Sequence, residues 1–577
     1  MNDIKGKTAE IVMDEQKEDA QKAVTGTNAA TDDSKSGMTN VDDNVKGAAK
    51  AGPKIGIISE LARRILDERS RFITIDNGTS TCVSSILVGD KIAKNTCIDR
   101  TGMFPNNIYY GADGTTYIGQ EAIDRGNADP ANMAYSFKPM ATTGGTLNLR
   151  GKERDAIELM ADVDLSVVTK TCERYGLKKE QIILTQSYPA TWTPEIIEKM
   201  CRAANDRGVN LDPRLMFSEP VAAITAAYEK NPDIHGKNVM IVDSGAGTTD
   251  SAIVVPSVDE KGIVNISTRS LDGVGVAGND FDTPIADRII EQSSIALQVS
   301  VDTLREDPAV MAAVMETTRL VKESLMDEKD LVSAIMIPGY DGKIVEYSMT
   351  FKEYASKIQP ILDSIEEMLK RALKSVTDDD VGNLEALGLE KFENVDVIVF
   401  AGGTSKGRYF RKYISERIVH KQVIDADSQT LVGEGLAILA RKYIPIIAAD
   451  RVTDLALNCR AQRGLAFGCI AADGTPKAHI HIYSKDVLPA RVTHTYYVQD
   501  RHGPSAAGDI YSTDVSDHEI VSLDPDGLSS IGRFVVELPQ GTKAGDEVIV
   551  TFDMLHNGVL MVSGTVHGET TDVTFEI

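Results

Sequence analysis

Residues 239–250 read VMIVDSGAGTTD, and residues 72–80 read FITIDNGTS. Each stretch is an apolar run typical of a buried strand, followed by an aspartate and a tight turn of glycine and small hydroxyl residues. Such a turn can direct backbone N–H groups at phosphate oxygens, while the aspartate holds a hydrated Mg²⁺. Because two opposed turns can hold one nucleotide, the pair predicts a phosphate site built on Asp76 and Asp243.

One such turn alone would be a weak signal, since surface turns use the same residues. The two turns lie far apart in the chain, and each follows a strand pattern, which makes the combination more specific. The chain contains no G-x-x-x-x-G-K-[ST] motif, so the common P-loop cradle for phosphate is absent. The sequence therefore favours a nucleotide site formed by two separate strand ends.

Length and charge limit the other possibilities. A chain of 577 residues exceeds the roughly 250 to 300 residues that one core organises, so we expect at least two folded units. The net charge of −25 disfavours nucleic acid as a partner, although solubility alone also explains it. No apolar run approaches the ~20 residues of a membrane span, and the N-terminus lacks the features of a secretory signal. We expect a cytoplasmic monomer without membrane partners.

Composition and hydrophobic patterning divide the chain into five segments. Residues 1–55 are polar and contain no aromatic residue, which predicts a disordered tail. Residues 56–70 place their apolar side chains on one helical face and predict a short helix. Residues 71–448 alternate apolar runs with amphipathic stretches, as in an α/β domain. After a linker at 449–458, residues 459–577 form short alternating segments broken by turns, which predicts an all-β sandwich.

The order of seven motifs along the chain resembles that of the 70-kDa heat-shock chaperone family, within the superfamily of actin-like ATPases. The resemblance covers residues 71–577 and implies an actin-like ATPase domain of two lobes with ribonuclease-H-like sheets, followed by a peptide-binding β-sandwich. The motifs are IDNGTS (75–80), SYPA (187–190), SEPVAA (218–223), DSGAGTTD (243–250), GNDFD (278–282), AGGTS (401–405) and FDMLHNGVL (552–560).

The resemblance implies ATP or ADP with Mg²⁺ as cofactors and a role for each site residue. Asp76 and Asp243 would hold Mg²⁺ through water, and Lys138 would lie on the γ-phosphate. Glu219, assisted by Asp250, would orient the attacking water. The nucleotide would contact Asp76, Gly78, Thr79, Ser80, Gly245, Ala246, Gly247, Thr248, Gly278, Lys322, Gly402, Gly403, Thr404 and Lys406. Taken alone, Lys138 is typical of a surface lysine and Glu219 of an ordinary helix start.

The chain departs from the family pattern near the nucleotide and between the domains. Ala246 and Ala277 replace glycines, Arg319 stands in place of a ribose-binding glutamate, and Met326 replaces a serine near the adenine. We expect these changes to alter nucleotide affinity or base selectivity. The linker reads DLALN at 454–458 instead of a run of leucines. The sequence therefore does not establish docking of a J-domain or nucleotide-exchange partner.

The predicted β-sandwich would bind an extended peptide through backbone hydrogen bonds and an apolar pocket formed by residues 474–482 and 496–510. No helical pattern follows it, so we expect no lid and only transient clients. His479 and His481 share a strand face and are a candidate metal pair. Because the sequence shows no clear third ligand, it favours exposed strand histidines instead.

These expectations lead to an ATP-hydrolysing molecular chaperone that binds extended polypeptide segments or unfolded proteins under control of its nucleotide state. One alternative is a nucleotide-binding scaffold or interaction protein in which hydrolysis and coupling have decayed. A second is a filament-forming ATPase of the cytoskeletal kind, which the predicted β-sandwich disfavours.

Overall fold

The computed structural model describes only part of the chain. The predicted helix at 56–70 and the predicted linker at 449–458 lie outside the described residues, as does most of the predicted tail. The described residues are 9–13, 71–88, 91–258, 264–376, 395–424, 428–448, 459–461, 464–470, 476–483, 486–498, 505–513, 520–522, 528–571 and 573–576.

The chain divides into two compact units. We call the first the α/β unit, which comprises Leu61–Cys459 together with His556–Val559. We call the second the β-rich unit, which comprises Met1–Glu60, Arg460–Leu555 and Leu560–Ile577. Among the described residues, no helix is long and apolar enough to cross a membrane.

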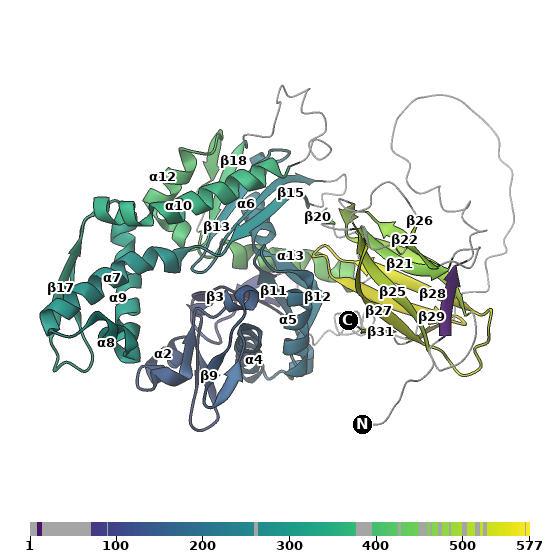
Figure 1. Ribbon diagram of the computed structural model, residues 1–577, viewed down its shortest axis with the longest axis horizontal. Helices are drawn as coiled ribbons and strands as arrows, with labels where there is room; N and C mark the ends of the chain where they lie inside the picture. Colours follow the sequence, from purple (N-terminus) through teal and green to yellow (C-terminus); the bar gives the residue numbers. More distant parts are fainter. Residues whose placement is uncertain are drawn as a thin grey trace. The chain divides into compact units, whose positions relative to one another are not determined.

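Two main sheets of the α/β unit share one plan. In each, three antiparallel strands continue into two parallel ones. The first sheet has the order β4 (Lys91–Lys94), β3 (Thr81–Val88), β2 (Arg71–Asn77), β11 (Ile182–Tyr188) and β12 (Asn210–Ser218), with β5 (Met103–Pro105) beside β3. The second has the order β15 (Val264–Val274), β14 (Thr249–Val258), β13 (Val239–Ser244), β18 (Val397–Ala401) and β19 (Gln422–Ile424). Figure 1 labels strands β3, β11 and β12 of the first sheet and β13, β15 and β18 of the second.

A pair of helices lies between these sheets. Helix α13 (Leu431–Ala448) packs on β2, β3 and β11, whereas α6 (Glu219–Lys230) packs on β13 and β14. The two helices also pack against each other, which joins the sheets through an apolar layer. Strands buried on both faces read as continuous apolar runs, as Val239–Val242 do.

Further helices cover the outer sides of the sheets. Helix α4 (Ala156–Tyr175) starts at a capping box of Asp155 and Glu158 and ends at the left-handed Gly176. Next to it lies α5 (Pro194–Asp206), and α10 (Phe351–Lys374) packs on β14 and β15. Smaller elements near the first sheet are β6 (Asn107–Tyr110), β7 (Thr116–Ile118), α2 (Gln120–Gly126), η2 (Pro130–Asn132), β8 (Met133–Tyr135), α3 (Met140–Thr143), β9 (Leu147–Leu149), β10 (Lys152–Arg154) and η3 (Lys179–Gln181). The short helix η4 (Pro232–Ile234) connects α6 to β13 of the second sheet.

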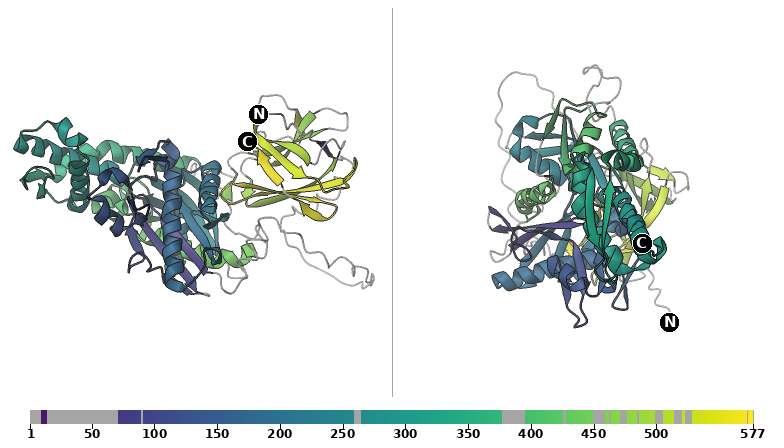
Figure 2. Two further views of the ribbon diagram at one scale, coloured as in Figure 1. Left: turned by 90° about the horizontal axis from the view of Figure 1, so that it is seen from below. Right: turned by 90° about the vertical axis from the view of Figure 1, so that its left-hand side faces the viewer.

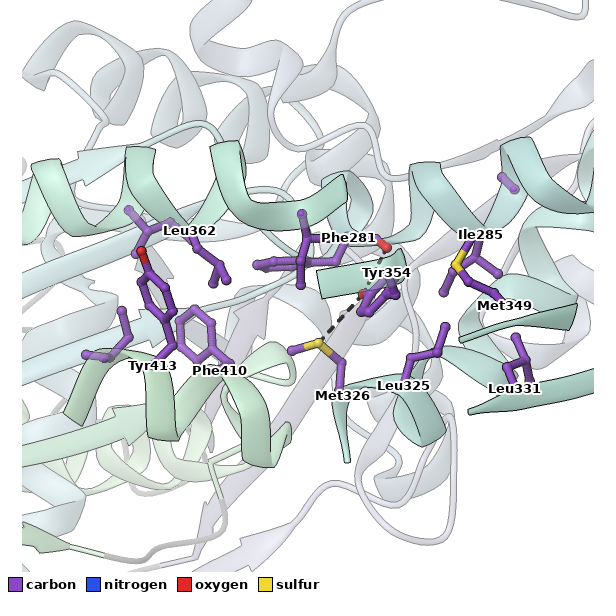
Figure 3. Packing of buried hydrophobic residues seen from close by; sticks show 14 of the residues in the cluster. Phe281, Ile285, Leu325, Met326, Leu331, Met349, Tyr354, Leu362, Phe410 and Tyr413 are labelled. Carbon is purple, nitrogen blue, oxygen red and sulfur yellow. Dashed lines mark hydrogen bonds between the residues drawn. The ribbon is translucent and has the colours of Figure 1, made fainter. Parts of the chain in front are cut away.

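One hydrophobic cluster extends from the second sheet to a group of helices and a hairpin (Figure 3). The buried Tyr354 hydroxyl lies inside it and donates to the Phe281 carbonyl (3.1 Å) and to the Met326 sulfur (3.6 Å). The elements around this cluster are α7 (Gly278–Leu297), α8 (Val301–Glu306), α9 (Pro308–Met326), β16 (Leu331–Met336), β17 (Ile344–Met349), η6 (Thr404–Lys406) and α12 (Arg408–Ser415).

The β-rich unit is a sheet that turns back on itself. Figure 2 draws the C-terminal strands of this unit in yellow. Along its hydrogen-bonded path, β21 and β28 are separated by β25, β1 and β24, yet Phe467 of β21 stacks on Phe552 of β28 with ring centroids 3.7 Å apart. Its side chains therefore meet across an apolar interior. The strands of this sheet are β1 (Ala9–Met13), β21 (Gly464–Ile470), β22 (Pro476–Ile482), β24 (Ala490–Val498), β25 (Ser505–Thr513), β26 (Ile520–Ser522), β27 (Leu528–Glu537), β28 (Glu547–Met554), β29 (Leu560–Val566), β30 (Glu569–Thr571) and β31 (Val573–Glu576). The short strands β20 (Cys459–Arg460) and β23 (Val487–Leu488) pair with each other in a separate two-stranded sheet.

Strand β1 falls within the segment that the sequence predicts to be a disordered tail. It pairs antiparallel with β24 and parallel with β25. The prediction did not include this strand, because low apolar content over 55 residues hides a five-residue run, AEIVM, that can complete a sheet through backbone hydrogen bonds.

Candidate active site

The two predicted phosphate turns face each other. The first joins β2 to β3 and the second joins β13 to β14, so each turn follows the strand that carries an aspartate. A Cβ placed on Gly247 would lie only 2.8 Å from Thr79 Oγ1, which shows that the turns are in contact. Strand ends far apart in the chain thus meet at one place.

Buried polar side chains hold the first turn. Ser187 Oγ donates to Asp76 Oδ1 (2.7 Å) from the end of β11. Asn106 Nδ2 donates to Asn77 Oδ1 (2.8 Å) and to the Gly78 carbonyl (2.6 Å). The aspartate and the turn behind it are therefore fixed by neighbouring strands.

The second turn is fixed by the start of α7 and by the loop after β18. The Gly278 amide donates to the Gly245 carbonyl (3.1 Å), and Thr404 Oγ1 donates to the same carbonyl (2.7 Å). The Asn279 amide donates to the Ala246 carbonyl (2.7 Å). Ala246 does not have a positive φ, so its Cβ carries no backbone penalty in this turn.

A cavity of about 520 Å³ opens between the turns. Most of the predicted site residues line it: Asp76, Gly78, Thr79, Ser80, Lys138, Glu219, Asp243, Gly245, Ala246, Thr248, Lys322, Gly402, Gly403, Thr404 and Lys406. The other three predicted residues do not line the cavity but contact residues that do. Gly247 contacts Thr79, Gly278 bonds to Gly245, and Asp250 lies opposite Asp243 in the β13–β14 ladder.

One end of the cavity is bounded by the loop after β18, which also contacts the second turn through Thr404. Gly402 has φ 81°, and a Cβ on it would lie 2.2 Å from the Ser244 carbonyl oxygen, so only glycine fits. Lys406 Nζ donates to Gln429 Oε1 (2.6 Å). Lys322 Nζ lies 2.9 Å from both the Gly278 carbonyl and Asp282 Oδ1, which places two lysines at this end.

One buried lysine faces four buried carboxyls at the centre of the site. Lys138 and Glu219 are only 3 % and 8 % exposed and form an ion pair. Burial opposes the charge of Lys138, but the carboxylates of Glu219, Asp76 and Asp250 raise its pKa overall. Lys138 is therefore not the surface lysine that its local sequence alone suggests, because its side chain is buried.

The same crowding acts on the aspartates. Burial, followed by repulsion from Glu219, raises the pKa of Asp76 to about 6 and that of Asp250 to about 7. Burial and the same neighbouring carboxylates raise the pKa of Asp243 well above its usual value. Four carboxyls share one lysine here, so their simultaneous ionisation is disfavoured without further positive charge. A hydrated divalent cation fits this set of oxygen donors, because it supplies the missing positive charge.

One residue that lines the cavity is not among the predicted site residues. Asp282 belongs to the GNDFD motif, and its ion pair with Lys322 places it on the cavity.

A second glycine-rich run lies before α7. Residues 273–278 read GVGVAG, a G-x-G-x-x-G run. It joins the antiparallel β15 to α7, which is not the parallel βαβ context of dinucleotide-binding folds.

Two of the departures noted in the sequence also line the cavity. The Arg319 guanidinium lies 5.5 Å from the centre of the Tyr135 ring. Met326 borders the cavity but is only 3 % exposed, and its sulfur accepts the hydrogen bond from Tyr354. It therefore acts largely as part of the hydrophobic cluster behind the site.

Comparisons with known proteins identify the family of the chain. The family model described as Hsp70 protein matches residues 203–577. The chaperone protein DnaK of Methanothermobacter thermautotrophicus is 23% identical over 513 residues, covering 86% of this chain and 78% of the relative. The chaperone protein DnaK of Picrophilus torridus is 24% identical over 512 residues, covering 86% and 75%. The chain belongs to the Hsp70 family.

Proposed function

We propose that the protein is an ATP-dependent molecular chaperone. In this proposal the α/β unit binds and hydrolyses ATP with Mg²⁺, and the β-rich unit binds extended polypeptide segments. The observation that carries the proposal is the convergence of two glycine turns, one buried lysine and the carboxyls of Asp76, Glu219 and Asp243 on a single cavity.

Each part of the cavity has a chemical task in this proposal. The turns at Gly78–Ser80 and Gly245–Thr248 offer backbone N–H groups and hydroxyls to phosphate oxygens. Lys138 stays protonated, since its pKa is raised, and supplies positive charge where negative charge develops during phosphoryl transfer. Mg²⁺, held through water by Asp76 and Asp243, would neutralise further phosphate charge.

Glu219 is the residue that we assign to the attacking water. It begins α6 directly after β12, so the helix and the sheet both fix its position. Its ion pair with Lys138 keeps the carboxylate directed into the cavity. Asp250 is assigned an assisting role from behind, because it lies beside Asp243 in the adjacent strand and titrates near neutral pH.

The same proposal assigns the architecture. Residues 71–448 form an actin-like ATPase domain whose two lobes each contain one ribonuclease-H-like sheet, supported by the shared strand order of the two sheets. Residues 459–577 form a β-sandwich, supported by ring contacts across the folded sheet. The α6–α13 pair between the sheets is the layer through which nucleotide-dependent changes would pass.

Backbone pairing in the β-rich unit supports binding of extended segments. Ile11–Met13 pairs with Tyr496–Val498 of β24, and Ala9–Glu10 pairs with Ala506–Ala507 of β25. Both partners fall within residues 496–510, which the sequence predicts to contact peptide. The gap between β24 and β25 thus accepts an extended strand through main-chain hydrogen bonds, the mode expected for client segments.

Steady-state phosphate release tests the ATPase. Glu219→Gln should slow hydrolysis at least ~100-fold while ATP still binds, because a positioned base contributes that much or more. Lys138→Met combined with Glu219→Gln removes both charges at nearly constant volume, so an inactive but folded protein remains measurable. Lys421→Ala, at an exposed lysine, is the matched control and should keep the wild-type rate. Equal background rates in wild type and Glu219→Gln would instead favour a nucleotide-binding scaffold.

Peptide-array binding, run separately with ATP and with ADP, tests the chaperone part. A nucleotide-dependent difference in peptide affinity is the expected result, since each nucleotide must favour one state of the β-rich unit. Binding that is identical with both nucleotides would contradict the proposed coupling. No binding with either would contradict the assignment of the β-rich unit.

A further inference from the structure

Three histidines meet inside the β-rich unit. His479 and His481 are two residues apart on β22 and therefore lie on the same strand face. His494 reaches the same place from β24. One ring nitrogen from each residue lies within 4.8 Å of the others. The ring centroids of His481 and His494 are 3.7 Å apart.

The fold, not local sequence, brings them together. Along the sheet, β22 and β24 are separated by β21, β25 and β1, so the two strands share no backbone pairing. Their side chains meet because the sheet turns back on itself, as the stacked rings of Phe467 and Phe552 also show. His494 is therefore the third candidate ligand, which the sequence alone did not connect with His479 and His481.

The trio is partly enclosed by the fold. His479 is only 3 % exposed and His481 and His494 are half-buried, so neither His479 nor His481 is the fully exposed strand histidine that the sequence favoured. The Phe467 ring lies 5.0 Å from that of His481. His481 Nε2 is buried and has no hydrogen-bond partner. A buried ring nitrogen without a partner is costly, and a ligand that accepts its lone pair would remove that cost. Among the described residues, no carboxylate or cysteine joins the three rings in the cluster.

We propose that His479, His481 and His494 bind one divalent transition-metal ion of the zinc class. Imidazole nitrogens suit zinc, copper, nickel and cobalt, whereas calcium and magnesium prefer oxygen ligands. Bond lengths of about 2.0–2.1 Å to zinc require the three nitrogens to approach within roughly 3.4 Å of one another, so the side chains must rotate on binding from their present spacing of up to 4.8 Å. The fourth coordination position is open to water or to another ligand.

Metal titration of the full, tag-free chain tests this site. The protein is stripped with a chelator and titrated with Zn²⁺ or Co²⁺ in excess Mg²⁺, which blocks the carboxylates of the ATP cavity. We expect one ion per chain with micromolar or tighter affinity and a visible Co²⁺ absorption spectrum of a low-coordinate nitrogen site. Zinc at about 100 times its Kd should raise the folding equilibrium constant about 100-fold, observed as a higher Tm.

Variants separate the trio from adventitious binding. His494→Ala and His481→Ala should lose the stoichiometric ion and the Tm increase. His494→Phe keeps a ring in the interior, so it remains informative if the alanine variant does not fold. His567→Ala is the matched control, because His567 lies exposed in the same unit and pairs with Asp546. Absence of binding in wild type, or equal binding by His494→Phe and wild type, would overturn the proposal.

Discussion

The carboxyl of Asp250 should make the nucleotide-free protein less stable as pH rises. We expect Asp250→Asn, which copies the shape of the protonated carboxyl, to remove this penalty. Asp250 is 1 % exposed and its pKa is raised from 3.8 to about 7, first by burial and then by Glu219. The substitution should therefore stabilise the protein at pH 8 while impairing hydrolysis.

The size of the effect follows from proton linkage. Below pH 3.8 the group is protonated in both the folded and the unfolded chain and has no effect on stability. Between that pH and about 7 the folded state keeps a proton that the unfolded state releases, so stability falls by about 1.4 kcal/mol per pH unit. From pH 5 to pH 8 the loss amounts to about 2–3 kcal/mol, allowing for proton sharing with neighbouring carboxyls.

Thermal melting in chelator, without nucleotide, measures this difference. At roughly 2 °C per kcal/mol for a unit of this size, the Tm advantage of Asp250→Asn over wild type should grow by about 4–6 °C between pH 5 and pH 8. Asp233→Asn serves as the control, because its side chain is 63% exposed and pairs with Lys237. A Tm difference for Asp250→Asn that is the same at both pH values would refute the reasoning.

Three further predictions concern the same molecule. Lys138→Met should lower the free energy of unfolding by about 3–5 kcal/mol, because Glu219 is left buried without its cation, and adding Glu219→Gln should restore most of it in denaturant titrations. Gly402→Ala should weaken ADP binding by more than 10-fold in calorimetry, since its Cβ would lie 2.2 Å from the Ser244 carbonyl oxygen; unchanged affinity would contradict the close approach. Deleting residues 1–13 should raise the affinity for an extended peptide in fluorescence anisotropy, because β1 no longer occupies the gap between β24 and β25; an unchanged affinity would show that clients bind elsewhere.

Some of the site was predictable because its signals are local. An apolar run, an aspartate and a glycine turn are adjacent in sequence, so Asp76 and Asp243 are recognisable without any knowledge of the fold. The start of α6 at Glu219 is also a local signal, because the acidic residue and the proline that favour a helix N-terminus are adjacent in sequence. The capping box at Asp155 and Glu158 was a comparable signal for α4 that the sequence reasoning did not use.

Other features depend on long-range neighbours. The pKa of Asp250 is set by burial and by Glu219, whose position on another element no spacing rule provides. Strand β1 is a five-residue run whose conformation depends on two sheet edges that it meets only in the folded chain. His494 lies beside His479 and His481 because the sheet folds back on itself, and the local residue pattern does not predict where it does so.

The sequence by itself determined which residues are candidates for phosphate binding and which family the order of the motifs resembles, because both signals lie in short runs of neighbouring residues. The tertiary structure decided which of those runs share a cavity, how many carboxyls surround Lys138, and where three histidines meet. The physical reason is range: backbone turns and strand patterns act over a few residues, whereas burial and charge act between side chains that only folding brings close together.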